Sequence, residues 1–169
     1  MRSWFRILLF LCAAAGFAAE PVWVSVSSAD RKLTFNAAEF AALPHNELVA
    51  ADPHAKAEHH YQGVSLRELL NRLDAPAGKK IRGAALQLAV LVRGTDGYAS
   101  VFSLTELDEL YGNRTVLLAE RDETGPFDAH NGPLRLVVAG DQLAARWVRN
   151  VVSIELITVG TVVPRPAHP

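Results

Sequence analysis

The chain has a single cysteine among its 169 residues, and this cysteine, Cys12, lies in the apolar N-terminal stretch. Leu11 precedes it, whereas a lipoprotein signal has a small residue there, so we do not expect Cys12 to carry a lipid. From residue 20 onward the sequence therefore excludes disulfides, thiolate metal ligands and a cysteine nucleophile. Such a domain must be held together by its apolar core, and a length of about 150 residues is sufficient for that.

Long runs of one charge are also missing. The formal net charge is −1, and once Arg2 and Arg6 are set aside, 15 basic side chains stand against 18 acidic ones. No cluster of lysine and arginine suggests a nucleic acid or an anionic membrane surface as a partner. The sequence also has no nucleophile elbow, no phosphate-binding loop and no arrangement of paired carboxylates.

The first 19 residues have the pattern of a secretory signal peptide. Arg2 and Arg6 give a positive start, residues 7–17 carry no charge, and Gly16 and Ala18 fit the small positions before a cleavage site. The apolar stretch is shorter than the roughly 20 residues that cross a bilayer. The two arginines are not adjacent, which favours general secretion over the twin-arginine route. We expect a periplasmic or secreted protein with no membrane span after cleavage.

The remaining sequence predicts one α+β domain over residues 20–163, followed by a disordered tail at 164–169. Alternating or continuous apolar stretches predict strands near residues 22–27, 31–35, 47–51, 85–93, 98–102, 115–119, 134–138 and 151–159. Capping sequences predict short helices after Asn36, Ser65 and Ser103, and a helical turn is expected at 141–148. Residues 52–60 and 120–131 are polar and are expected to be loops. Helices this few and short favour a sheet domain over a doubly wound fold.

Five motifs then follow one another in a fixed order. They are YQGVSLRELL at 61–70, GTDGY at 94–98, SL at 103–104, VLLA at 116–119, and GPLRLVVAGD at 132–141 with RWVRNV at 146–151. Together they cover about residues 47–158 and resemble the sulfite-oxidase-type molybdopterin-binding oxidoreductase domain in its small stand-alone bacterial form. The resemblance implies a sulfite-oxidase-like fold with a central mixed sheet and short helices.

The resemblance also implies where a functional site would lie. In the full enzymes of this family, molybdenum sits on a pterin dithiolene and a cysteine thiolate is the protein ligand. The matching motifs would place Asp96, Tyr98, Arg135, Asp141 and Arg146 near the equivalent cleft.

Two features depart from this enzyme pattern. The strand expected to carry the metal ligand, at 47–51, has only Leu48, Val49, Ala50 and Ala51 in its interior, and aliphatic side chains cannot coordinate molybdenum. General secretion passes unfolded chains, so a cofactor inserted in the cytoplasm would be lost during export. We therefore predict that the domain binds no molybdopterin and performs no molybdenum redox catalysis.

The residues themselves suggest a site for an anion. Arg135 interrupts an apolar strand, and the planar fork of an arginine can clamp a carboxylate, sulfate or phosphate. Arg93 and Arg146 are expected to converge with it on one ligand. The ligand-binding cleft is predicted to contain His60, Tyr61, Arg93, Asp96, Tyr98, Arg135, Asp141 and Arg146.

Each of these candidates also has an ordinary structural explanation. Asp96 stands beside Gly97, where both residues suit a tight turn, and Tyr98 would then be a strand aromatic. Arg135 would point to water if its strand is half exposed. Arg146 and Arg149 flank Trp147 and would form a solvated face around one buried tryptophan.

A histidine-rich segment is the other candidate. His54, His59 and His60 are suitable ligands for zinc, copper or nickel, although their spacing matches no metal motif. Adjacent histidines in a strand point to opposite faces, so His59 and His60 would rarely share one ion. An exposed polar loop is the favoured explanation of these histidines, and if one of them enters the cleft, we expect it to be His60.

These observations favour an exported, non-catalytic binding module for a small anionic ligand or for a periplasmic or membrane protein partner. One alternative is a molybdopterin-dependent oxidoreductase with a metal ligand other than cysteine. A second alternative is periplasmic metal binding through the histidines.

Overall fold

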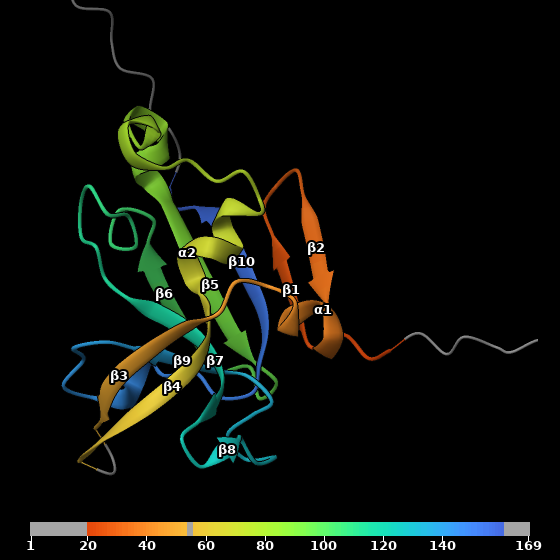
Figure 1. Cartoon of the computed structure of the whole chain (residues 1–169). Coiled ribbons are helices and arrows are strands. Elements are labelled where there is room, and N and C mark those ends of the chain that lie inside the picture. Colours follow the sequence, from red (N-terminus) through yellow and green to blue (C-terminus); the bar gives the residue numbers. More distant parts are fainter. Residues whose placement is uncertain (1–19, 54–55, 161–169) are drawn as a thin grey trace, which may run out of the picture.

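The computed structural model describes residues 20–53 and 56–160. The predicted signal peptide, His54 and the predicted tail at 164–169 lie outside these residues. Two five-stranded sheets form the domain. The first contains, in order across the sheet, β2 (Lys32–Phe35), β1 (Val24–Ser27), β10 (Val151–Thr158), β5 (Leu88–Gly94) and β6 (Ala99–Ser103) (Figure 1). Because β1 and β10 run parallel and the other neighbours antiparallel, this sheet is mixed.

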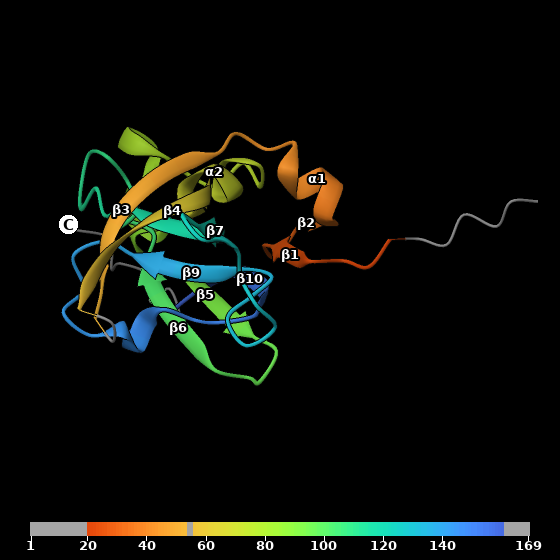
Figure 2. The same cartoon turned by 60° about the horizontal axis from the view of Figure 1, so that its bottom comes forward.

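The second sheet is antiparallel throughout. It contains β3 (Asn46–Asp52), β4 (Ala57–Ser65), β7 (Val116–Asp122), β8 (Gly125–Pro126) and β9 (Arg135–Val138). The strand β7 pairs with β4 on one side and with β8 and β9 on the other. In Figure 2, β7 and β9 lie above β5 and β6 of the first sheet. Apolar residues of both sheets form one buried cluster, which is the core.

The helices are short, as the sequence predicts. They are α1 (Ala37–Ala41), α2 (Leu66–Asn71) and the 3₁₀ turns η1 (Gly78–Lys80), η2 (Gly83–Gln87) and η3 (Ala144–Arg146). Asn36 and Glu39 form the predicted capping box of α1, with hydrogen bonds of 2.8 and 2.9 Å. Ser65 caps α2, which buries Leu66 and two further leucines in the core. None of the helices in the described part of the chain is long and apolar enough to cross a bilayer.

Three local predictions were wrong. Residues 57–60 belong to β4 rather than to a loop, because they pair with residues 49–52 of β3. The predicted loop at 120–131 begins as strand, since β7 extends to Asp122 and pairs with β8. The predicted strand at 85–93 begins only at Leu88, after η2.

The predicted helix after Ser103 is also absent. Residues 104–112 form successive turns, although Ser103 does accept a hydrogen bond from the backbone of Glu106. The reason lies in Asp108, whose buried carboxylate accepts the backbone N–H groups of Leu110 and Gly78. A side chain that binds backbone donors in this way competes with helical hydrogen bonds. The α+β class, with a mixed sheet and few short helices, is confirmed.

Candidate functional site

A cleft of about 640 Å³ opens where the end of β3, the turn before β6 and the segment around η3 meet β9. We call it the Arg135 cleft. Three residues predicted for the site, Asp96, Tyr98 and Arg135, line it. The other lining residues are Pro53, Leu143, Ala144, Ala145, Trp147 and Arg149. The structure therefore brings together motifs that stand about 40 residues apart in the sequence.

Arg135 is the buried cation of this cleft. All four residues of β9 are buried, and Arg135 itself is only 7% exposed, so it does not point to water. Its Nη2 donates to Oδ2 of Asp52 at 3.0 Å, and its guanidinium carbon lies 5.2 Å from the ring centre of Trp147. Its Nε has no hydrogen-bond partner among the residues that the structure describes.

Trp147 forms the floor of the cleft beside Arg135. The residue is 4% exposed, and its Nε1 is a second buried donor without a partner in the described part of the chain. Its ring meets that of Tyr61 edge-on, with ring centres 5.8 Å apart. Tyr61 is 1% exposed and lies in the core behind Trp147 rather than in the lining of the cleft. Burial raises the pKa of Tyr61 to about 12, against the opposing effect of the positive charge on Arg135.

The turn of residues 94–98 forms the rim of the cleft. Oδ1 of Asp96 accepts the backbone N–H of Tyr98 at 2.9 Å, and Gly97 has a φ of +82°, which glycine adopts without strain. The hydroxyl of Tyr98 donates to the carbonyl of Ala145 at 2.6 Å and so ties the rim to η3. Asp96 and Tyr98 thus have the expected turn chemistry and also line the cleft.

Arg149 joins Arg135 at the cleft, in the place where Arg146 was expected. Its Nη1 donates to Nε2 of His130 across 2.7 Å, because a guanidinium has N–H donors and no acceptor. No ion pair joins Arg149 to a carboxylate within the described ranges. The sequence places Arg149 two residues after the buried Trp147, but nothing there distinguishes it from Arg146.

Arg146 is bound by carboxylates instead. It contacts Asp141 through two hydrogen bonds of 2.9 and 2.6 Å, and its Nη1 donates to Glu106 at 3.0 Å. These bonds, the one to Asp141 first, raise the pKa of Arg146 above its usual value. Arg93 lies on another surface, with its Nε 3.7 Å from Glu155 on the neighbouring strand. Arg93, Arg135 and Arg146 therefore do not converge on one anion.

The histidines lie apart from the cleft. Nδ1 of His59 lies 2.7 Å from Oε1 of Glu123, and the backbone N–H of His60 donates to the other oxygen of Glu123 at 2.9 Å. The side chain of His60 lines a separate hollow with Glu47 and Arg121. No group of three or more His, Cys, Asp or Glu side chains within residues 20–53 and 56–160 is placed to hold a metal ion.

The side chains of the cleft also show whether this chain could supply a ligand to molybdenum. The cleft has no thiolate, and the strand β3 ends beside it at Asp52, whose carboxylate binds Arg135 and which Pro53 follows. The two buried N–H donors and the charge of Arg149 suit an anion or another hydrogen-bond acceptor. The described residues therefore fit an anionic group and do not fit a metal ligated by this chain.

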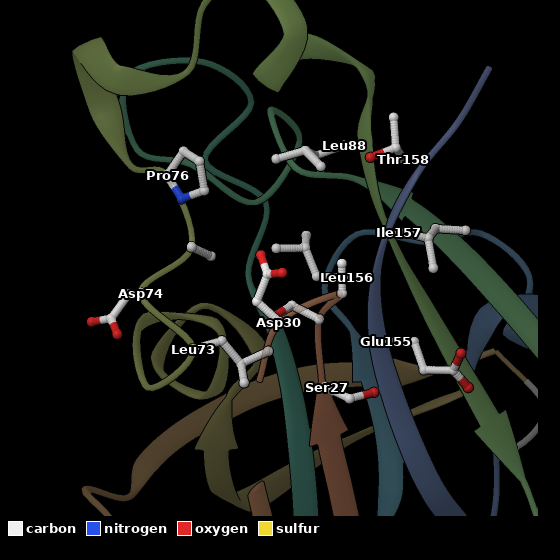
Figure 3. A pocket seen from close by; sticks show the side chains of 13 residues that line it. Ser27, Asp30, Leu73, Asp74, Pro76, Leu88, Glu155, Leu156, Ile157 and Thr158 are labelled. Carbon is white, nitrogen blue, oxygen red and sulfur yellow. The ribbon is translucent and has the colours of Figure 1, made fainter. Parts of the chain in front are cut away.

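A second cavity, of about 580 Å³, lies between the turn after β1, the segment after α2 and the end of β10. Figure 3 shows the carboxylates of Asp74 and Glu155 on opposite sides of this cavity, with Asp30 between them. Asp74 forms an ion pair with Arg31, and Glu155 lies near Arg93. Because these acids do not converge and none of the predicted site residues is present, the Arg135 cleft is the candidate site.

Comparisons with known proteins agree with this fold. The structure is similar to that of the sulfane dehydrogenase SoxCD from Paracoccus pantotrophus, with a TM-score of 0.59 and 18% sequence identity. The match covers 79% of this chain and 37% of that chain, and at this identity it supports the fold alone. The search of curated proteins finds no matching sequence. The family model described as "Oxidoreductase molybdopterin binding domain" matches residues 22–160. The chain belongs to the oxidoreductase molybdopterin binding domain family.

Proposed function

We propose that this chain is an exported binding module that holds a small anionic ligand in the Arg135 cleft. The observation that supports the proposal most is the pair of buried donors, Nε of Arg135 and Nε1 of Trp147, which have no partner among the described residues. Both belong to side chains that line the same cleft.

The energetics favour a ligand with acceptor oxygens. A buried donor without a partner costs about 1–3 kcal/mol, and two such donors are a large fraction of the stability of an ordinary domain. A sulfonate, sulfate, carboxylate or phosphate group that enters the cleft accepts these hydrogen bonds once the side chains of Arg135 and Trp147 turn their buried N–H groups toward it. Arg149 adds a positive charge that no carboxylate balances within the described ranges, and hydrogen bonds between ionised groups are stronger than neutral ones.

The test uses Trp147 as its own reporter. The full chain has three tryptophans, so the double replacement Trp4→Phe and Trp23→Phe leaves Trp147 as the single one. We expect its fluorescence to change and saturate when methanesulfonate is added. The variant Arg149→Gln is expected to weaken binding at least tenfold, whereas Arg82→Gln, an exposed arginine outside the cleft, leaves it unchanged. Absence of any saturable response would refute the proposal.

A molybdopterin-dependent oxidoreductase is the second candidate, and membership of the family favours it. We propose that this chain does not depend on molybdenum, because its cleft offers no thiolate ligand. Elemental analysis and absorbance of the protein purified from its native periplasm distinguish the two. One molybdenum per chain with the absorbance of a dithiolene would support the enzyme and overturn the first proposal.

A further inference from the structure

We infer that the ligand of the Arg135 cleft is an amphipathic organic anion, with one anionic head and an apolar body, rather than an inorganic oxyanion. The inference rests on the proposed function and concerns the class of ligand. It follows from the way in which the charged and the apolar side chains divide the lining of the cleft.

The apolar part of the lining has no function in binding an inorganic ion. It consists of Pro53, Leu143, Ala144 and the ring of Trp147, and the ring of Tyr98 stands at the rim. Leu143 is 74% exposed, the highest value among the exposed large apolar residues of the described chain. A hydrated sulfate or phosphate would leave this surface in water, whereas an apolar body attached to the anionic head would cover it.

The charged side chains of the cleft suit a ligand with one negative charge. Asp52 balances the charge of Arg135 through its 3.0 Å ion pair, and the carboxylate of Asp96 at the rim accepts a hydrogen bond from its own turn and forms no ion pair with Arg149. The side chain of Arg149 hydrogen-bonds to Nε2 of His130 and to no carboxylate among the residues that the structure describes. Among the described residues, Arg149 is thus the cation of the cleft without an ion pair and is the one that can meet the head of the ligand, with Nε of Arg135 and Nε1 of Trp147 as further donors.

The size of the cleft also agrees with a ligand that has both an anionic head and an apolar body. Its volume of about 640 Å³ lies within the range of clefts that bind small organic molecules, which is roughly 300–1,000 Å³. Such clefts combine mainly apolar walls with a few polar groups that fix the orientation of the ligand. An inorganic oxyanion would fill only a small part of this volume.

Three probes separate the contribution of the charge from that of the apolar body. Methanesulfonate has the anionic head alone, benzenesulfonate adds an apolar ring, and benzenesulfonamide has the ring without the charge. If about 60 Å² of the ring leaves water, benzenesulfonate binds about tenfold more tightly than methanesulfonate. We expect benzenesulfonamide to give no saturable change in the fluorescence of Trp147.

Two variants test where each half of the ligand lies. Leu143→Asn is expected to weaken benzenesulfonate several-fold and to leave methanesulfonate unchanged. Leu110→Asn is its matched control, because Leu110 is also exposed, at 65%, and lies outside the cleft. Arg149→Gln is expected to weaken both sulfonates by a similar factor.

The outcomes distinguish this inference from the proposed function. Equal affinity for the two sulfonates, or no effect of Leu143→Asn, would overturn the inference and leave the anion-binding proposal standing. No binding of either sulfonate would overturn the proposed function and the inference with it. Equal binding of benzenesulfonate and benzenesulfonamide would show that the negative charge of the ligand does not contribute to its affinity. That result would contradict both the proposed function and the inference.

Discussion

The buried ion pair between Asp52 and Arg135 gives the most demanding test of the structure. The two side chains are 10% and 9% exposed, and they join the end of β3 to β9 across the second sheet. We consider the single replacements Arg135→Met and Asp52→Leu, and the double replacement that combines them. Each single change breaks the ion pair and leaves one of its two charges in place, whereas the double change removes both charges.

The expected magnitudes follow from this difference. Removing one partner of a buried pair costs about 3–5 kcal/mol, because the remaining charge is no longer compensated. Replacing both partners by apolar side chains of similar volume is often close to neutral. Arg135→Met also removes the contact with the face of Trp147, which contributes about 0.5–2 kcal/mol. We therefore expect the double variant to be more stable than either single variant, with a coupling energy of about 3 kcal/mol.

Urea denaturation monitored by tryptophan fluorescence measures these free energies of unfolding. With a slope of about 2 kcal/mol per molar urea, each single variant should lower the midpoint by about 2 M. Two results would refute the reasoning. One is a loss below about 1 kcal/mol for Arg135→Met, and the other is a double variant whose loss equals the sum of the two single losses.

Three further predictions concern other parts of the fold. Gly63→Ala should destabilise the domain by about 3 kcal/mol in urea denaturation, because its Cβ would lie 2.6 Å from Cα of Ala119 on the paired strand. Stability should fall between about pH 10 and 12, since unfolded Tyr61 ionises while the buried phenol, with a pKa of about 12, stays neutral; Tyr61→Phe should flatten this fall by up to about 2.7 kcal/mol. Hydrogen bonds from its own backbone, then from the backbone of His60, lower the pKa of Glu123 from 4.5 to about 2. Its stabilising effect should therefore be complete above about pH 4.5 and be lost progressively as the pH falls toward 2, which acid unfolding of the protein and of Glu123→Gln would detect.

Features that depend on neighbours in the sequence were predictable. The caps at Asn36 and Ser65 involve residues three positions apart, and both are present in the structure. The same kind of signal at Ser103 did not produce a helix, because the carboxylate of Asp108 binds Gly78, which lies 30 residues away. Local patterns therefore predicted the class of the fold, and long-range hydrogen bonds decided where a pattern failed.

The candidate site shows the same limit. The interruption of an apolar strand by Arg135 was visible in the sequence, but its partner Asp52 lies 83 residues earlier. Arg146 and Arg149 are the same residue type on one short segment, and Asp141 decides between them by binding Arg146. The sequence alone does not show which of the two arginines faces the cleft, because that depends on the direction in which the folded segment around η3 points each side chain.

The position of β10 has a consequence for how the protein is made. This strand is the last of the described chain, yet it lies between β1, the first strand, and β5 (Figure 1). Until Val151–Thr158 leaves the ribosome, β1–β2 and β5–β6 are two unconnected hairpins with apolar faces uncovered. Isolated hairpins are at best marginally stable in water, so the domain cannot complete its first sheet during synthesis. The chain topology thus makes the first sheet the later of the two to be completed, because every strand of the second sheet is synthesised before Val151–Thr158.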